Sequence, residues 1–348
     1  MKRSTLPHRL LREAGHLFAG QPRVVAAVSG GGDSVALAGL LLQSGLVAPE
    51  NLILAHFDHN LRPDSGSDRQ FTEQLATAWG LPCITATWND RPVGGNLHAQ
   101  ARAARYGFLI ATARKTGATV VATGHQMDDR AETFLDRLLR GSGTTGLAAM
   151  PPTRPLAPGI TLVRPLLAFR HQELQAWLMG EKIPWREDPG NANLCFLRSR
   201  IRHQLLPELQ KSMNHDPAER IANAAARLTM ASDALEWCLD RLLPGLEFQA
   251  EPDCFSSSRK ATGELPDELA RRLLARCHRQ LTGSPHPPGQ RATEQFLRLL
   301  HSGRRSWSMA MHGLEIRTQE ERLMFFARRG PPRRGVDCRS QKRSPGNS

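Results

Sequence analysis

Short runs of apolar, often β-branched residues alternate with longer helix-type segments through the first half of the chain. The apolar runs predict strands at residues 24–28, 52–57, 83–88 and 119–123. The segments that follow them predict helices at residues 35–43, 67–79, 98–116 and 128–139. Strands separated by helices of this length are typical of βαβ units. The pattern therefore predicts an α/β fold, with a Rossmann-like parallel sheet and helices on both of its faces.

The second half of the chain follows a different pattern. A proline-rich stretch at residues 150–158 breaks the alternation, before one more strand at 160–163 and a helix at 172–179. Apolar residues spaced three and four apart predict a long amphipathic helix at 218–243, interpreted as a connecting arm. Beyond it, helices are predicted at 268–281 and 291–300, and short strands at 307–311, 314–318 and 323–327. We predict an α/β domain over residues 1–210, a helical linker over 211–246, a small α+β domain over 247–327 and a basic disordered tail over 328–348.

Polar clusters stand where three of the predicted strands end. They read SGGGDS at residues 29–34, HFDHNLR at 56–62 and TGHQMDDRAET at 123–133. In open α/β sheets, ligands bind beyond the carboxyl ends of the strands. The sequence therefore predicts one functional site at this edge of the sheet.

The cluster SGGGDS has the composition of an anion site. Glycines let the backbone turn tightly, so that successive N–H groups can point at one oxyanion, and the helix that follows adds its positive N-terminal end. Ser29 and Ser34 can donate from their hydroxyls, and Asp33 can hold a metal ion or a proton. No Gly-Lys-Ser/Thr follows the glycines, and G-x-G-x-x-G is absent, so neither a Walker loop nor a dinucleotide fingerprint is predicted. For the glycines alone, a flexible turn is the alternative.

The charged residues of the later clusters leave alternatives open. Asp129 and Glu132 are three residues apart on one predicted helix face, and could cap the helix, hold an ammonium group or bind magnesium. The arginines Arg198, Arg200 and Arg202 cannot all share one helix face. They suit phosphates approached from two sides, or a structural set of salt bridges. Arg102 and Arg105 share a face with Tyr106, which alone is typical of a solvated stripe.

Composition narrows the class of protein. The 348 residues carry a formal net charge of +13, which favours a polyanionic partner. Residues 328–348 hold seven Arg and Lys against one Asp. No apolar run approaches the roughly 20 residues needed to span a bilayer, so no membrane segment is predicted. The six cysteines form no C-x-x-C pair, and their spacing suits neither zinc nor an iron–sulfur cluster. Unpaired thiols in a reducing cytoplasm explain them most simply.

Several motifs together resemble one enzyme family. The string S-G-G-x-D-S is similar to the pyrophosphate loop of the N-type ATP pyrophosphatases, the PP-loop enzymes. It is followed in order by HFDHNLR, ARAARY, ATGHQMDDRAET, LLRGSGTTGL, RPLL, WREDPGN and RSRIR, over roughly residues 20–207. In this order the blocks resemble the tRNA(Ile)-lysidine synthetase family. Two positions depart from the family's usual residues: Arg130 stands where Gln is common, and Ser199 where Asn is common.

The resemblance implies a reaction and a set of substrates. ATP would adenylylate carbon 2 of the wobble cytidine in the CAU anticodon of tRNA(Ile), with release of pyrophosphate. Free lysine would then attack that carbon and displace AMP, which gives lysidine. The family's properties imply ATP and magnesium as cofactors, a cytoplasmic location and tRNA contacts from the small domain at 247–327. A homodimer is left open.

The resemblance also implies roles for single residues. It assigns ATP binding to Ser29, Gly30, Gly31, Gly32, Asp33, Ser34, His56 and Gly124, with Asp33 beside magnesium. Asp33, Arg105 and His125 would be catalytic, the last two facing the α-phosphate and the adenylylated base. Asp129 and Glu132 would receive the lysine ammonium group, and Arg198, Arg200 and Arg202 would contact tRNA.

Two other functions remain open from the sequence. The first is a tRNA thiolase of the same loop class, although such enzymes use the C-x-x-C pairs that are missing here. The second is a basic RNA-binding module without catalytic activity, which would consume no ATP.

Overall fold

The computed structural model describes residues 6–20, 22–61, 65–92, 94–148, 150–187, 197–284 and 286–328. The chain divides into two compact units, residues up to Met230 and residues from Ala231 onward, so the division falls within helix α10 (Pro217–Leu242). Some residues of the predicted motifs lie outside the described residues: Arg62, the segment 188–196 with Cys195, and all of the predicted basic tail except Arg328. In the part of the chain that is described, no helix combines the length and the apolar character needed to cross a membrane.

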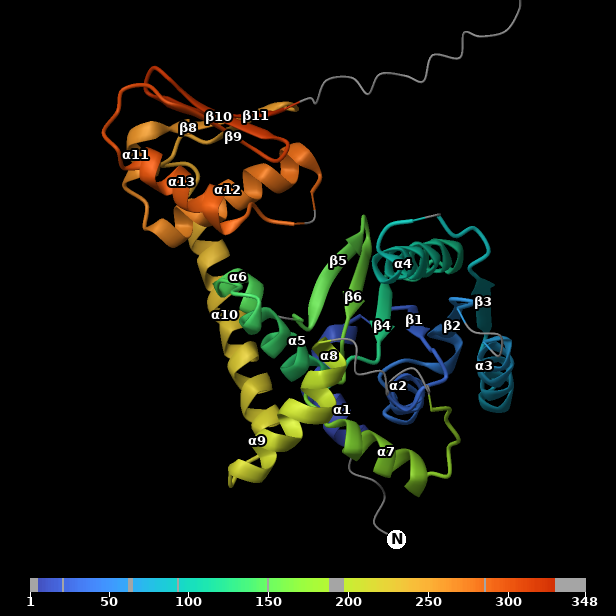
Figure 1. Ribbon diagram of the computed structural model, residues 1–348. Helices are drawn as coiled ribbons and strands as arrows, with labels where there is room; N and C mark the ends of the chain where they lie inside the picture. The colour runs from blue at the N-terminus through green and yellow to red at the C-terminus, as the bar shows by residue number, and fades with distance from the viewer. Residues whose placement is uncertain are drawn as a thin grey trace, which may run out of the picture. The chain divides into compact units, whose positions relative to one another are not determined.

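The first unit is built on a six-stranded sheet in the order β3-β2-β1-β4-β6-β5 (Figure 1). The strands are β1 (Val24–Ala27), β2 (Leu52–Asp58), β3 (Cys83–Thr87), β4 (Val120–Thr123), β5 (Thr153–Ala157) and β6 (Ile160–Val163). All neighbouring strands pair in parallel except β5, which runs antiparallel to β6. The predicted α/β fold with a mainly parallel sheet is confirmed.

Helices cover both faces of this sheet because the side chains of each strand alternate between them. Val24 packs with α1 (Leu6–Ala14), α2 (Gly32–Gln43), α3 (Gly66–Trp79) and α7 (His171–Gly180) in one buried cluster. Its neighbour Val25 packs in another cluster with α4 (Leu97–Thr116). The two-sided burial explains why the strands are almost uninterrupted apolar runs.

The proline-rich stretch contains a strand that the sequence pattern did not predict. Residues 153–157 form β5, and the register of its pairing shifts between Pro155 and Ala157. A proline cannot donate a backbone hydrogen bond, so it is tolerated mainly at the edge of a sheet or at a bulge. Because β5 is one of the two edge strands, its prolines, which are typical of turns, do not exclude it from the sheet.

A further helical layer follows α7 in the first unit. It comprises α8 (Leu197–Arg200), a π-helical turn η4 (Ile201–Leu205), α9 (Leu206–Ser212) and the start of α10. Ile201, Leu206 and Ala218 pack against Met127 and Ala131 of α5 (Met127–Leu139), which leads into the short α6 (Thr144–Leu147). This packing holds the arginines of α8 and η4 beside the start of α5.

The second unit is an α+β structure with its own core. Its antiparallel sheet has the order β7-β8-β11-β10-β9, and the predicted strands and helices of this region are all present. The elements are β7 (Gln249–Ala250), β8 (Cys254–Ser258), α11 (Arg259–Gly263), α12 (Asp267–Thr282), α13 (Gln290–Leu300), β9 (Ser308–Met311), β10 (Leu314–Gln319) and β11 (Arg322–Ala327). The sequence pattern missed β7 and β8, because the serines of β8 hide its strand character. Phe255, Phe296 and Phe325 lie in the core between sheet and helices.

Candidate active site

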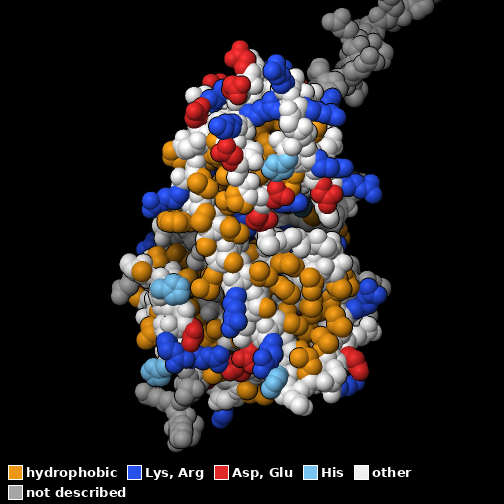
Figure 2. All heavy atoms as spheres, turned by 90° about the vertical axis from the view of Figure 1, so that its left-hand side faces the viewer, with side chains coloured by type: hydrophobic (Ala, Val, Ile, Leu, Met, Phe, Trp, Pro, Cys, Tyr) orange, Lys and Arg blue, Asp and Glu red, His pale blue; other side chains and the backbone are white. Residues whose placement is uncertain are grey.

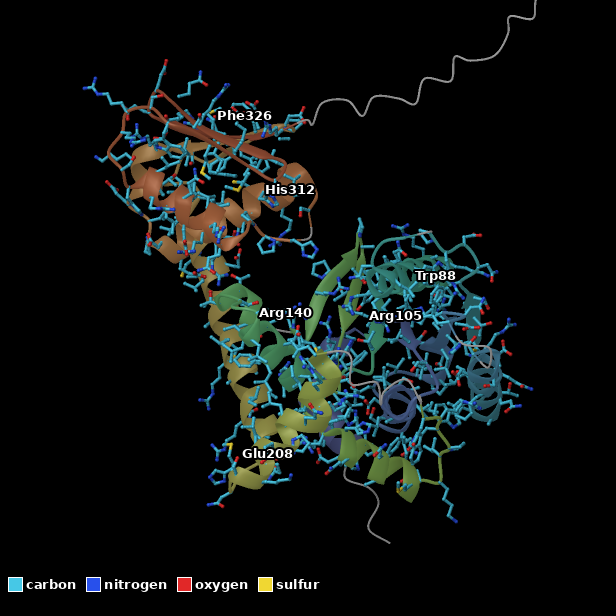
Figure 3. The ribbon with its side chains drawn as sticks, in the orientation of Figure 1. Trp88, Arg105, Arg140, Glu208, His312 and Phe326 are labelled. Atoms are coloured by element: carbon cyan, nitrogen blue, oxygen red, sulfur yellow. The ribbon has the colours of Figure 1, made fainter. Side chains whose placement is uncertain are left out.

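A cleft of about 1240 Å³ lies at the carboxyl ends of the parallel strands, where the sequence predicted a site. It is lined by many of the predicted site residues: Ser29, Gly31, Gly32, Asp33, Ser34, Arg105, Gly124, His125, Asp129, Glu132, Arg198 and Arg202. Gly30, His56 and Arg200 are not among its lining residues. Figure 3 shows Arg105 below α4 in that view, close to β4.

The glycine loop between β1 and α2 is held in one conformation by its own serines. Gly30 has a φ of +92°, a backbone conformation that glycine adopts without steric cost. The Ser34 hydroxyl accepts the Ser29 N–H at 3.0 Å and donates to the Gly31 carbonyl at 2.8 Å. Helix α2 begins at Gly32, and among the described residues no side chain caps its N-terminus. The first amides of α2 are therefore available to an anion.

Gly124 fixes the distance between this loop and the start of α5. A Cβ atom at position 124 would lie 2.8 Å from the Asp33 carbonyl oxygen and 3.0 Å from the Ser34 Cα. Both contacts are with backbone, which cannot rotate away. The predicted ATP residue Gly124 is therefore required sterically for the close approach of the β4–α5 connection to the loop.

Asp33 has a partner that sequence reasoning missed. The His171 Nδ1 donates to Asp33 Oδ1 at 2.7 Å, and this hydrogen bond raises the pKa of His171. The backbone N–H of His171 also donates to Asp128 Oδ2 at 2.8 Å, which fixes the start of α7 against α5. The predicted helix began one residue later, and the 138 residues between His171 and Asp33 leave no local pattern by which to pair them.

The Trp185–Arg186 segment braces the opposite side of the glycine loop. The Arg186 N–H donates to the Gly30 carbonyl at 3.0 Å, while its guanidinium contacts Asp68 at 2.6 Å. Trp185 lies against Gly32, where an added Cβ would be 3.4 Å from its ring. The motif WREDPGN thus contributes a backbone and side-chain brace to the loop, at least through its described residues.

The two histidines after β2 differ in position. His56 is buried, its Nδ1 donates to the Val28 carbonyl at 3.0 Å, and burial lowers its pKa. It therefore supports the end of β1 from behind the cleft. His59 lines the cleft and packs edge-on against Phe57, with ring centroids 5.1 Å apart.

His125 lies at the centre of the site, after β4. Its Nδ1 is 2.9 Å from the Thr123 hydroxyl. Burial, with the nearby guanidinium charges of Arg164 and Arg105, lowers the pKa of His125 to about 3, against the opposing effect of Asp129. The imidazole is therefore neutral at physiological pH.

The two predicted carboxylates meet two of the three predicted arginines. Arg198 contacts Asp129 at 2.6 Å and Glu132 at 2.9 Å, and Arg202 contacts Glu132 at 2.5 Å and Asp129 at 3.2 Å. Glu132 is fully buried, and Asp129 also accepts the Gln126 N–H, which caps α5. Arg200 is exposed. Residues that the sequence suggested for lysine and for tRNA thus form one ion-pair network.

Comparison with known proteins identifies the class of the first unit. The model of the PP-loop domain family matches residues 6–209, more than half of the chain. A solved U34-tRNA thiolase, NcsA from Methanococcus maripaludis, superimposes with a TM-score of 0.56 over 65% of this chain and 78% of its own. At 16% identity this likeness shows the shared fold alone. The first unit is a PP-loop domain.

More similar relatives define the family within that class. A tRNA(Ile)-lysidine synthase of Ruegeria pomeroyi is 38% identical over 88% of this chain and 72% of its own. Another, of Bradyrhizobium diazoefficiens, is 40% identical over 76% of this chain and 75% of its own. The chain belongs to the tRNA(Ile)-lysidine synthase family. The predicted resemblance is confirmed, as is the prediction that the protein is an ATP-using enzyme of this family.

Proposed function

We propose that this protein uses ATP to join lysine to carbon 2 of the wobble cytidine in tRNA(Ile) with a CAU anticodon, which gives lysidine. The observation that supports this most directly is that one cleft joins the glycine loop to the acidic pair Asp129 and Glu132. A nucleotide phosphate and a cationic amino acid can therefore be held side by side, with His125 between the elements that carry them.

The glycine loop would hold the pyrophosphate part of ATP. The uncapped start of α2 offers amide donors, and the Ser29 and Ser34 hydroxyls lie at the same turn. Magnesium typically binds through one or two carboxylates together with substrate phosphates, and the single carboxylate of Asp33 at this loop fits such a site. The metal would neutralise charge on the phosphates. His171 holds Asp33 in position through Oδ1.

Arg105 and His125 would act at the bond that changes. The Nε of Arg105 is buried and has no hydrogen-bond partner among the described residues, which leaves a permanent cation available to the α-phosphate. His125 is neutral, so it can hydrogen bond with the cytosine or its adenylylated form without adding charge. In the first step the cytidine O2 bonds to the α-phosphorus and pyrophosphate leaves.

Asp129 and Glu132 would bind one ammonium group of lysine, while the other amine attacks carbon 2 as the free base. The new C–N bond forms, the bond from carbon 2 to the adenylyl oxygen breaks, AMP departs, and the amine loses its proton. The carboxylates already hold two guanidinium groups, so the site suits cations, and the lysine ammonium would compete with Arg198 and Arg202 for the same oxygens. Positioning and charge stabilisation supply the rate enhancement.

The remaining charge would serve tRNA binding. We assign tRNA contacts to Arg198, Arg200 and Arg202, and to the small α+β region over residues 247–327, in a cytoplasmic enzyme that could act as a homodimer. On the face drawn in Figure 2, Lys and Arg side chains are spread among apolar and acidic ones. The net charge of +13 therefore favours RNA without by itself marking where the RNA lies.

The test is transfer of labelled lysine into tRNA(Ile) with a CAU anticodon, in the presence of ATP. The full-length protein should label the RNA and release pyrophosphate, whereas Asp33→Asn should label it at least a hundredfold more slowly. Asp136→Asn is the matched control, since this carboxylate lies on α5 in an exposed pair with Arg140. RNA binding without ATP consumption would show a non-catalytic module, and sulfur incorporation would show a thiolase.

A further inference from the structure

Four arginines surround the Tyr106 side chain. Arg102 and Arg105 come from α4, Arg154 from β5 and Arg164 from the end of β6. The guanidinium carbons of Arg102, Arg105 and Arg154 lie 5.0, 5.3 and 4.8 Å from the centre of the Tyr106 ring. Arg164 is buried, with 5% of its surface exposed, and influences the same tyrosine electrostatically. We call these four residues the Tyr106 arginines.

Within the part of the chain that the structure describes, this group has no counter-charge of its own. Among the described residues, no carboxylate forms an ion pair with any of the Tyr106 arginines. The Nε atoms of Arg105 and Arg164 are buried without hydrogen-bond partners. Burial and the neighbouring guanidinium groups lower the pKa of Arg102, and that of Arg164 to about 10. Cations crowded in this way are held at a cost that an anion would relieve.

The tyrosine ring offsets only part of the cost of crowding these cations together. Guanidinium groups over an aromatic face gain modest attraction, but the ring carries no net charge. Its exposed fraction is 9%, so it is no open platform for stacking a base. The donors that remain are guanidinium N–H groups, whose planar forks match the oxygens of phosphate.

The position of the group distinguishes it from the glycine loop. Arg102 and Arg105 line the cleft, whereas Arg154 does not and belongs to the edge strand β5. The charges of Arg164, Arg105 and Arg102 all lower the pKa of His125, so the group lies close to this residue of the cleft. The arginines therefore lead from the reacting centre to the edge of the sheet. A nucleotide held by the loop can reach Arg105 but has no need of a contact at Arg154, whereas a polymer that leaves the cleft does.

We propose that the Tyr106 arginines other than Arg105, which the proposed function assigns to the α-phosphate, bind a backbone phosphate of the RNA strand that carries the target cytidine. This inference rests on the proposed function for its choice of RNA. The ligand is a phosphodiester, and the arginines position the strand so that the cytidine reaches His125. A phosphate of ATP is the other source of the same chemistry.

The experiment measures the affinity of the full-length protein for tRNA(Ile) with a CAU anticodon and, separately, for ATP, over a range of salt concentrations. Arg154→Gln should weaken tRNA binding by about tenfold and reduce the slope of log affinity against log salt by about 1. ATP affinity should be unchanged. Arg154→Lys, which keeps the charge without the fork, should recover part of the affinity and most of the slope. Arg140→Gln is the matched control, since Arg140 is exposed and paired with Asp136.

Each other outcome has a distinct meaning. Unchanged tRNA affinity and slope in both Arg154→Gln and Arg102→Gln would overturn the inference. Loss of ATP affinity with tRNA binding intact would assign the phosphate to ATP and also overturn it. If the parent protein bound tRNA but made no lysidine, and Arg154→Gln still lost affinity and slope, the proposed function would fail while the phosphate site stood. Arg154 is half-buried at a sheet edge, and thermal unfolding of the variant checks that its fold is kept.

Discussion

Two groups of arginines reach the same cleft, and they differ in how their charge is balanced. Arg198 and Arg202 share four contacts with Asp129 and Glu132, so their charge is matched within the protein. Among the described residues, the partners of the Tyr106 arginines are an aromatic ring and a few carbonyl oxygens. The charges of Arg198 and Arg202 are already balanced, so another cation can bind Asp129 and Glu132 only by competing with them. The charges of the Tyr106 arginines are balanced only when an anion binds from outside the protein.

The comparison shows that a count of basic residues does not locate a binding site. Both groups contribute to the net charge of +13, but unmatched charge near the cleft attracts a polyanion more strongly than charge that carboxylates already balance. A buried ion pair broken on one side leaves an uncompensated charge, whereas removal of an unmatched cation leaves none. A substitution in the first group should therefore cost much more stability than one in the second.

The largest effect is expected when the network of Arg198 and Arg202 loses the buried carboxylate of Glu132. Glu132→Gln should lower the free energy of unfolding by about 3 kcal/mol, because both guanidinium groups lose a partner that is fully buried. The loss stays at the low end of the range because Arg198 and Arg202 are partly exposed. Urea denaturation measures it. Asp136→Asn, in an exposed pair on the same helix, should cost less than about 0.5 kcal/mol. Equal losses would show that the buried network adds no stability.

The next effect concerns lysine. Asp129→Asn should raise the Michaelis constant for lysine about ten- to a hundredfold and change that for ATP little, because one charge-assisted contact to an ammonium is lost. An asparagine oxygen can still accept the Gln126 N–H, so the cap of α5 is kept. Steady-state kinetics with each substrate varied in turn gives both constants. A loss of ATP binding with lysine affinity intact would move Asp129 to the nucleotide site.

A smaller effect on stability is expected for a substitution among the Tyr106 arginines. Arg102→Gln should leave the free energy of unfolding within about 0.5 kcal/mol of the parent, because the loss of a cation whose surface is exposed but whose charge is partly desolvated also removes repulsion from its neighbours. The same urea denaturation series measures it. A loss as large as that of Glu132→Gln would mean that the two groups are equally matched, and the comparison would fail.

The smallest effect is on protonation. Arg164→Met should raise the pKa of His125 above its present value of about 3, because one of the charges that lower it is removed while the burial remains. The pKa of His125 is lower folded than unfolded, so its stability contribution is complete above about pH 6.5 and is lost as the pH falls toward 3. Arg164→Met should therefore narrow the pH range, between the folded and unfolded pKa values of His125, over which this stability is lost. Titration of the His125 ring by NMR tests the shift, and an unchanged or lower pKa would contradict it.

The elements with strong local patterns were predictable from the sequence. The apolar strands and the helices of the first unit follow from alternation and period, and the site at their carboxyl ends follows from the parallel sheet. The family motifs brought in the glycine loop, His125 and the acidic pair. Strand β5 was missed, because its prolines carry the signature of a turn while its edge position tolerates them.

The contacts that define the site chemically were not predictable in this way. His171 reaches Asp33 across 138 residues, and Arg202 reaches Glu132 across 70. Tyr106 gathers arginines from one helix and two strands, of which only Arg102 and Arg105 are its neighbours in sequence. Such pairings depend on the tertiary arrangement, and a single sequence holds no periodic signal for them.

The close approach at Gly124 has a consequence for the choice of amino acid. Because backbone meets backbone there, the start of α2 and the start of α5 cannot slide past one another, and the separation between the phosphate-binding turn and the Asp129–Glu132 pair is set by the scaffold. On the proposed mechanism, that fixed separation selects the length of the amino acid. An amino acid one methylene shorter than lysine, anchored by the same carboxylates, would hold its free amine short of the carbon that must be attacked. Selectivity for lysine would then reside in a glycine that never touches it.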